Sequence, residues 1–118
     1  MRAQDLEDRL INFAVSVIKA CKYLDKSFAS EHLSKQLIRS TTSVALNYGE
    51  ARGGESTRDY LHKMKICLKE LRESYINLKI KKGAELITNI EVLDGLIDEN
   101  NQLISIFVVS IKNTKTST

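Results

Sequence analysis

The sequence predicts an all-α protein, folded as an antiparallel, up-down-up-down four-helix bundle. The chain has 118 residues with no proline, no tryptophan and only five glycines, and it is rich in Leu, Ile, Lys and Glu, as helical proteins are. Apolar residues recur at three- and four-residue steps along four segments that short links separate. The length suits one domain with its own core, so we expect residues 1–118 to form a single unit.

The first two helices are predicted at about residues 5–24 and 30–51. The first has a continuous apolar face, made by Leu6, Leu10, Phe13, Ala14, Val17, Ile18, Cys21 and Leu24. The link that follows it contains serines able to cap the second helix, and we expect Phe28 to pack under the end of the bundle. The second helix ends before Gly53 and Gly54, where a tight reversal is expected.

The third and fourth helices are predicted at about residues 56–80 and 89–111. Ser56 with Asp59 has the spacing of an N-terminal cap for the third helix. A second capping pattern, Thr88 with Glu91, precedes the fourth helix.

The end of the chain carries two further expectations. Residues 112–118 contain no apolar anchor, so we expect them to form a frayed tail. The preceding segment IFVVSI is apolar nearly all round. This pattern favours burial against a neighbouring subunit over burial in the core of a monomer.

A polar stripe runs along the second helix beside its apolar face. Its members recur at steps of three and four, and they are Gln36, Ser40, Ser43, Asn47 and Glu50. Ser43, Asn47 and Glu50, with the nearby Arg39, are placed to meet polar residues of the third helix, in the same or an adjacent protomer: Lys63, Glu70, Glu73, Ser74 and Asn77. We interpret these residues as a layer that sets helix register, with a buried ion pair at Arg39. A nucleic-acid-binding face is the alternative.

A resemblance to a known family is concentrated in residues 36–73, which read QLIRSTTSVALNYGEARGGESTRDYLHKMKICLKELRE. They resemble the signature of the four-helix bundle family encoded by intervening sequences within bacterial 23S rRNA genes. The shared pattern is a Gln-Leu, an Arg-Ser, a Ser, an Asn and a Glu-Ala, followed on the next helix by a Ser, an Asp-Tyr, a Lys and a Lys-Glu. Looser similarity extends from Leu6 to Ile111. Ala51 follows Glu50 here, where many relatives outside the intervening-sequence branch have Gly, which places the chain nearer to that branch.

The resemblance implies a left-handed four-helix bundle that assembles into a ring-like homopentamer around a central channel. The family is also similar to the accessory variability protein of diversity-generating retroelements. The basic pentameric surface of that protein is associated with nucleic acid and with a reverse transcriptase. No catalytic residues come with the resemblance.

Positive charge is concentrated before the fourth helix. Residues 1–89 carry 16 Lys and Arg against 11 Asp and Glu, whereas residues 90–111 carry four acidic residues and no basic one. Candidates for phosphate contacts lie near the glycine turn and along the third helix: Lys65, Lys69, Arg72, Lys79, Lys81, Lys82, Arg52 and Arg58. Because no aromatic platform is expected, RNA or DNA would be bound electrostatically rather than by base readout. Lysines that are merely solvated, and a protein-interaction scaffold without nucleic acid, are the alternatives.

Catalysis is not expected from this sequence. His32 and His62 lie on different helices without a His or Glu partner one turn away, so no metal site is predicted. Cys21 and Cys67 lie among apolar residues, where a thiol acts as a small hydrophobe. The N-terminus is acidic, and no apolar run is long enough to cross a membrane. We therefore expect a cytoplasmic protein without a cofactor.

Overall fold

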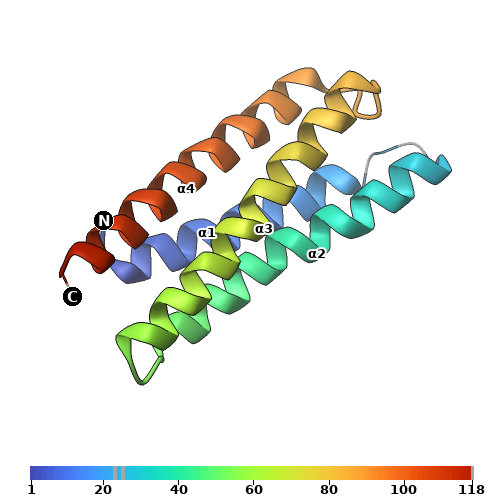
Figure 1. Ribbon diagram of the computed structural model, residues 1–118. Coiled ribbons are helices and arrows are strands. Elements are labelled where there is room, and N and C mark those ends of the chain that lie inside the picture. Colours follow the sequence, from blue (N-terminus) through green and yellow to red (C-terminus); the bar gives the residue numbers. More distant parts are fainter. Residues whose placement is uncertain (23, 25, 118) are drawn as a thin grey trace.

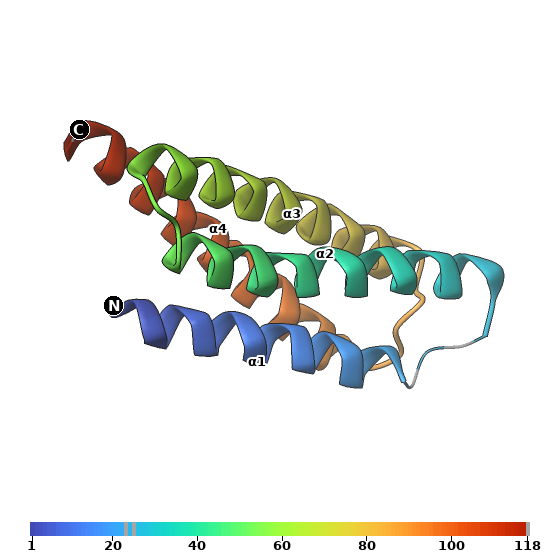
Figure 2. The same ribbon diagram turned by 90° about the horizontal axis from the view of Figure 1, so that it is seen from below.

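The computed structural model contains four helices, in the order expected (Figure 1). They are α1 (Ala3–Cys21), α2 (Phe28–Arg52), α3 (Thr57–Gly83) and α4 (Ile90–Ser117). The structure describes residues 1–22, 24 and 26–117. Consecutive helices run in opposite directions along a common axis (Figure 2). The all-α four-helix bundle is thus confirmed, whereas its left-handed sense stays a prediction.

Polar side chains cap the N-termini of α2, α3 and α4, as the sequence indicates. Ser27 Oγ accepts a hydrogen bond from the backbone N–H of Ser30 at the start of α2, and Ser56 Oγ accepts one from Asp59 at the start of α3. At α4 the expected cap was wrong by one residue, because the Oδ1 atom of Asn89 accepts from the N–H of Val92. Asparagine is the better N-cap residue of the two, because threonine ranks below asparagine at this position.

The helix ends correct three expectations. α4 continues to Ser117, so the frayed tail expected over residues 112–118 is wrong up to residue 117, and Thr118 lies outside the described residues. α1 ends at Cys21 instead of residue 24; of the expected last turn, Tyr23 lies outside the described residues. α3 continues through Gly83, and the left-handed backbone that follows it is adopted by Glu85, with φ 57°. That conformation normally favours glycine.

Phe28 does not pack under the bundle. It is 86% exposed, and its ring lies parallel to that of His32 one turn later in α2. The expectation was wrong because α2 begins at Phe28 itself, which places the side chain on the outer surface of the first turn.

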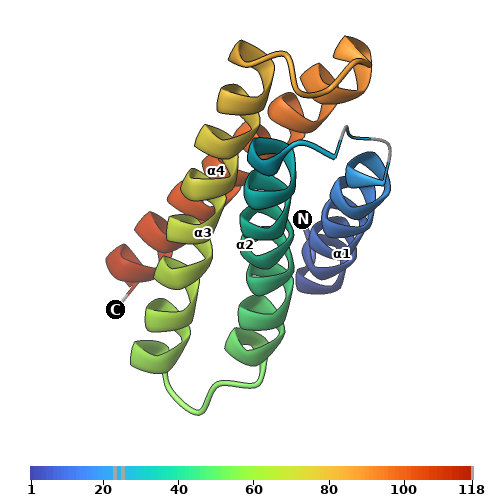
Figure 3. The same ribbon diagram turned by 90° about the vertical axis from the view of Figure 1, so that its right-hand side faces the viewer.

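The core is built from one apolar stripe of each helix. It contains Leu10 and Val17 from α1, Leu37 and Val44 from α2, Met64, Leu71 and Leu78 from α3, and Leu93, Leu103 and Phe107 from α4. Tyr48 meets Phe107 edge-on across the core, with ring centroids 5.8 Å apart. Among the helix pairs that touch, α2 and α3 make the most extensive contact and α1 and α4 the least extensive. Figure 3 shows α2 and α3 lying side by side along their length.

Candidate nucleic-acid interface

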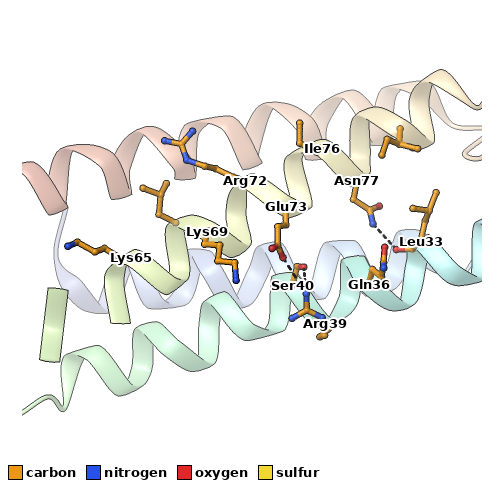
Figure 4. Close-up of a pocket in the computed structure, with 12 residues that line it drawn as sticks. Leu33, Gln36, Arg39, Ser40, Lys65, Lys69, Arg72, Glu73, Ile76 and Asn77 are labelled. Atoms are coloured by element: carbon orange, nitrogen blue, oxygen red, sulfur yellow. Dashed lines mark hydrogen bonds and ion pairs between the residues drawn. The ribbon is translucent and has the colours of Figure 1, made fainter. Parts of the chain in front are cut away.

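A groove follows the outer face between α2 and α3, with a volume of about 810 Å³ (Figure 4). α2 contributes Leu33, Gln36, Arg39 and Ser40, and α3 contributes Lys65, Leu68, Lys69, Arg72, Glu73, Ile76, Asn77 and Ile80. Towards the N-terminal end of α3 its lining is cationic, and towards the C-terminal end it is largely apolar. The groove therefore offers charge at one end and apolar surface at the other.

Three of the expected phosphate-binding residues lie together in this groove. Lys65, Lys69 and Arg72 are spaced by four and three residues, so they project from one stripe of α3. The same spacing continues backwards through His62 to Arg58, and these two line an adjoining hollow with Lys65. We call Arg58, Lys65, Lys69 and Arg72 the α3 cation stripe.

The cations of the α3 cation stripe are solvent-exposed and unpaired. Within the part of the chain that the structure describes, Arg58, Lys65, Lys69 and Arg72 make no ion pair or side-chain hydrogen bond. A cation without a protein partner keeps its charge free for a ligand anion. Phosphate binding at this stripe would therefore not require an existing ion pair to break.

Three other expected phosphate-binding residues are already engaged. The Nζ atom of Lys82 lies 2.8 Å from Asp94 Oδ1 on α4, and Arg52 Nη1 lies 3.2 Å from Glu7 Oε2 on α1. Lys79 stands over the ring of Tyr75, with Nζ 5.4 Å from the centroid. The structure therefore separates these residues from the free cations of the α3 cation stripe.

Lys81 was expected on the basic surface, and that expectation is wrong. Its side chain is completely buried, and its Nζ donates a hydrogen bond of 2.8 Å to Asn77 Oδ1. Burial lowers the pKa of Lys81 from 10.5 to about 8, because a charged amine is poorly solvated in the core. Position 81 follows 67, 71, 74 and 78 along the buried stripe of α3. Helical periodicity therefore predicts a buried residue at position 81, although the adjacent lysines suggest an exposed basic surface.

Arg39 makes the expected ion pairs, but on the surface. Its guanidinium lies 3.4 Å from Glu70 Oε1 and 3.3 Å from Glu73 Oε2. The Arg39 side chain is 60% exposed, whereas that of Glu70 is 10% exposed. The Arg39–Glu70 ion pair is therefore partly exposed to solvent within this chain, because only its acidic partner is buried.

The other polar residues of α2 divide between local contacts and contacts with α3. The amide of Asn47 donates to the backbone carbonyl and the hydroxyl of Ser43, one turn earlier in the same helix. Glu50 reaches α3, where its Oε2 lies 2.6 Å from Lys63 Nζ. Gln36 is exposed and lines the groove. These contacts span exposed and half-buried positions, so they do not make a single buried layer within one chain.

A buried polar cluster lies instead between α3 and α4. The Ser74 hydroxyl and the Asn100 amide oxygen form a hydrogen bond, and Asn100 Nδ2 donates to the carbonyl of Leu71 at 2.8 Å. Asn77 Nδ2 donates to the carbonyl of Leu33, which links α3 to α2. No role was predicted for Asn100 from the sequence. Its signal was the helical spacing that places it on the buried face of α4, in line with Leu93, Leu103 and Phe107.

Cys21 is half-buried and Cys67 is buried. Burial raises the pKa of the Cys67 thiol to about 12, which keeps it protonated at neutral pH. Across residues 1–22, 24 and 26–117, no three or more His, Cys, Asp or Glu side chains come together as metal ligands would. None of the helices in this part of the chain is long and apolar enough to span a membrane.

The fold and its groove define a class of protein, a small antiparallel four-helix bundle with free cations on one outer face. Within that class, the chain can be assigned to one family. A family model described as 23S rRNA-intervening sequence protein matches residues 4–107, and the chain belongs to this family. The family suggested by residues 36–73 is thereby confirmed.

A solved structure supports the same assignment. The chain is similar to a crystal structure of a protein with unknown function from the S23 ribosomal protein family of Bacteroides thetaiotaomicron. The two share 28% identity with a TM-score of 0.81, over 95% of this chain and 99% of that one. No functionally curated protein matches the chain.

Proposed function

We propose that this member of the 23S rRNA-intervening sequence protein family is a non-catalytic homo-oligomer that binds RNA or DNA electrostatically. The observation that carries the proposal is the α3 cation stripe, whose lysines and arginines make no ion pair within the described chain. From Arg58 to Arg72 the stripe is about 21 Å long, which is enough to contact several phosphates of one strand.

Self-association strengthens the proposal. The family resemblance implies a homopentamer, and five copies with a net charge of +3 each would carry 5 × 3 = +15. Exposed apolar residues suitable for contacts between copies lie on α1 and α4: Ile11, Val15, Ile18, Val108 and Val109. The last two belong to the segment for which burial by a neighbour was expected. An RNA partner would place the protein in the cytoplasm.

A protein-interaction scaffold is the competing function. Its specific support is the apolar end of the groove, where Leu33 of α2 faces the exposed Ile76 and Ile80 of α3. A groove with an apolar floor can also accept an amphipathic helix of a partner protein. The two functions differ in their response to salt, because phosphate binding releases counterions whereas apolar packing does not.

The deciding experiment is light scattering of the purified protein, alone and with a structured RNA, at low and moderate salt. The proposal predicts a mass of several protomers and an RNA complex that dissociates as salt rises. An oligomer that ignores RNA at both salt concentrations would favour the scaffold. A monomer that ignores RNA would contradict the proposed function and the expected burial of Val108 and Val109 by a neighbouring copy.

A further inference from the structure

An exposed aromatic pair lies at the start of α2. The rings of Phe28 and His32 are 6.0 Å apart and inclined by only 7°, a stacked arrangement. Phe28 nevertheless remains 86% exposed, so His32 covers little of it. A large planar apolar group is thus presented to solvent on a helix, with a parallel aromatic ring one turn away.

The aromatic pair is continuous with the groove between α2 and α3. Phe28, His32 and Gln36 are spaced by four residues, and Arg39 follows three residues later, so all four project from one face of α2. Gln36 and Arg39 line the groove. The pair therefore lies one turn beyond the groove, at its apolar end, where the antiparallel α3 presents Ile76 and Ile80.

Positive charge flanks the aromatic pair. Lys26 and Lys35 are exposed, and neither makes an ion pair or side-chain hydrogen bond within the described residues. The acidic residues nearby in the sequence are Glu31, which is exposed, and Asp25, which lies outside the described residues. Unpaired cations beside an open aromatic face are the two elements with which proteins hold single-stranded nucleic acid.

We propose that Phe28 and His32 form a stacking platform for an unpaired nucleobase of a single strand whose phosphates lie on the α3 cation stripe. This inference rests on the proposed nucleic-acid binding and specifies its partner as a single strand or an unpaired loop. The groove then supplies both requirements of such a ligand, with phosphate contacts at its cationic end and base contacts at its apolar end.

The platform discriminates between nucleic-acid forms because of base pairing. In a duplex, each base is stacked between its neighbours, and its faces cannot reach a protein ring without being extruded. In a single strand or loop the faces are available, and stacking on an aromatic ring is indifferent to base identity. The protein should therefore prefer unpaired over paired strands of equal charge, with little sequence preference.

The test compares labelled oligonucleotides of about 12 nucleotides, a length within the site sizes known for single-strand binders, by fluorescence anisotropy. A single-stranded RNA, a single-stranded DNA and an RNA hairpin with the same number of phosphates are bound to the wild type, Phe28→Ala and Phe28→Trp. Leu46→Ala is the matched control, because Leu46 is an exposed apolar residue on the outside of the same helix, 69% exposed. The melting temperature and oligomer mass of each variant are measured in parallel.

The proposal predicts that Phe28→Ala weakens single-strand binding about fivefold or more, from the loss of one stacked base. Hairpin binding should change by less than about twofold, Phe28→Trp should restore single-strand binding, and Leu46→Ala should have no effect. A single-stranded probe carrying 2-aminopurine should lose fluorescence on binding the wild type, and not on binding Phe28→Ala. Because Phe28 is exposed, its variants should keep the wild-type melting temperature. The affinities of the wild type for single-stranded RNA and single-stranded DNA are compared directly. Tighter binding of RNA would identify RNA as the preferred strand, and equal binding would show that the platform accepts both.

Three results would overturn the platform. Equal weakening of single strand and hairpin would make Phe28 a general contact, and unchanged binding would leave it without a role. Loss of oligomer mass in Phe28→Ala would assign the pair to a contact between copies instead. If the wild type binds none of the three probes, the proposed nucleic-acid function itself fails, a result distinct from failure of the platform alone.

Discussion

The two ends of α3 differ in what happens to their positive charges. Near the N-terminal end, Lys65, Lys69 and Arg72 are separated in sequence yet lie together in solvent. Near the C-terminal end, Lys81 and Lys82 are adjacent in sequence yet separate, one into the core and the other into an ion pair with α4. Clustering in a sequence is therefore a poor guide to a basic patch on a helix. The helical face and the nearest acidic residue decide which charges are available.

The same contrast holds between the inner and outer faces of α3. On the inner face, polar groups have partners within the bundle, so their substitution should change stability. On the outer face, the cations of the α3 cation stripe have none among the described residues, so their substitution should change ligand binding. Four substitution experiments test this division.

Asn100→Ala should have the largest effect on folding. It removes the partner of the Ser74 hydroxyl and a donor to the Leu71 carbonyl in a buried site, and it leaves a small cavity. We expect the free energy of unfolding, measured by urea denaturation, to fall by about 2–4 kcal/mol. Asn101→Ala, at the exposed neighbouring position, is the control and should change it by less than about 0.5 kcal/mol. A similar loss in both variants would contradict the special role of the buried cluster.

Neutralising the free cations should affect binding without affecting folding. A triple variant with Lys65, Lys69 and Arg72 changed to Gln should bind RNA about tenfold or more weakly, with the salt dependence reduced by about two released counterions. The control removes the same three charges from engaged residues, by changing Arg52, Lys79 and Lys82 to Gln. Anisotropy titrations at several salt concentrations compare the two. Equal losses would mean that net charge, and not the arrangement of the α3 cation stripe, governs binding.

Lys81→Met should stabilise the protein at neutral pH. The pKa of Lys81 is lowered from 10.5 to about 8 in the folded chain, so below pH 8 the folded state holds an unfavourable buried charge. Between pH 8 and 10.5 the unfolded chain binds more protons than the folded chain, and wild-type stability gains from rising pH. We expect an advantage of about 1 kcal/mol for the variant at pH 7, shrinking above pH 8. Denaturation of both proteins across this range measures the difference, and an advantage that grows with pH would refute the assignment.

Arg39→Ala should have the smallest effect in an isolated chain. Its contacts with Glu70 and Glu73 are 3.3–3.4 Å long and open to solvent, so the loss should be about 0.5 kcal/mol. Light scattering and urea denaturation are measured together. A fall of more than about 2 kcal/mol, or a smaller oligomer, would indicate that a neighbouring copy buries the pair.

Most of the fold and part of the candidate site could be predicted from the sequence. Helix number and order followed from apolar periodicity, and the grouping of Lys65 with Lys69 followed from their spacing. The position of Lys81 could have been predicted, because it continues the buried stripe of α3, but its charge argued for the surface. The outward position of Phe28 could not, since it depends on a helix start two residues earlier than expected. Pairing of cations with α1 and α4 required the three-dimensional arrangement of the helices.

The uneven packing of the four helices bears on how the molecule opens. α1 contacts α2 along its length but reaches α4 less extensively, and a bidentate pair between Arg9 and Glu99, with distances of 2.8 and 2.6 Å, joins those two helices. Cooperative units within a protein follow such differences in contact. We therefore expect α1 to be the first element to detach in a partial unfolding event, with amide hydrogens that exchange ahead of those of α2 and α3. The groove, carried entirely by α2 and α3, should keep its shape while α1 opens.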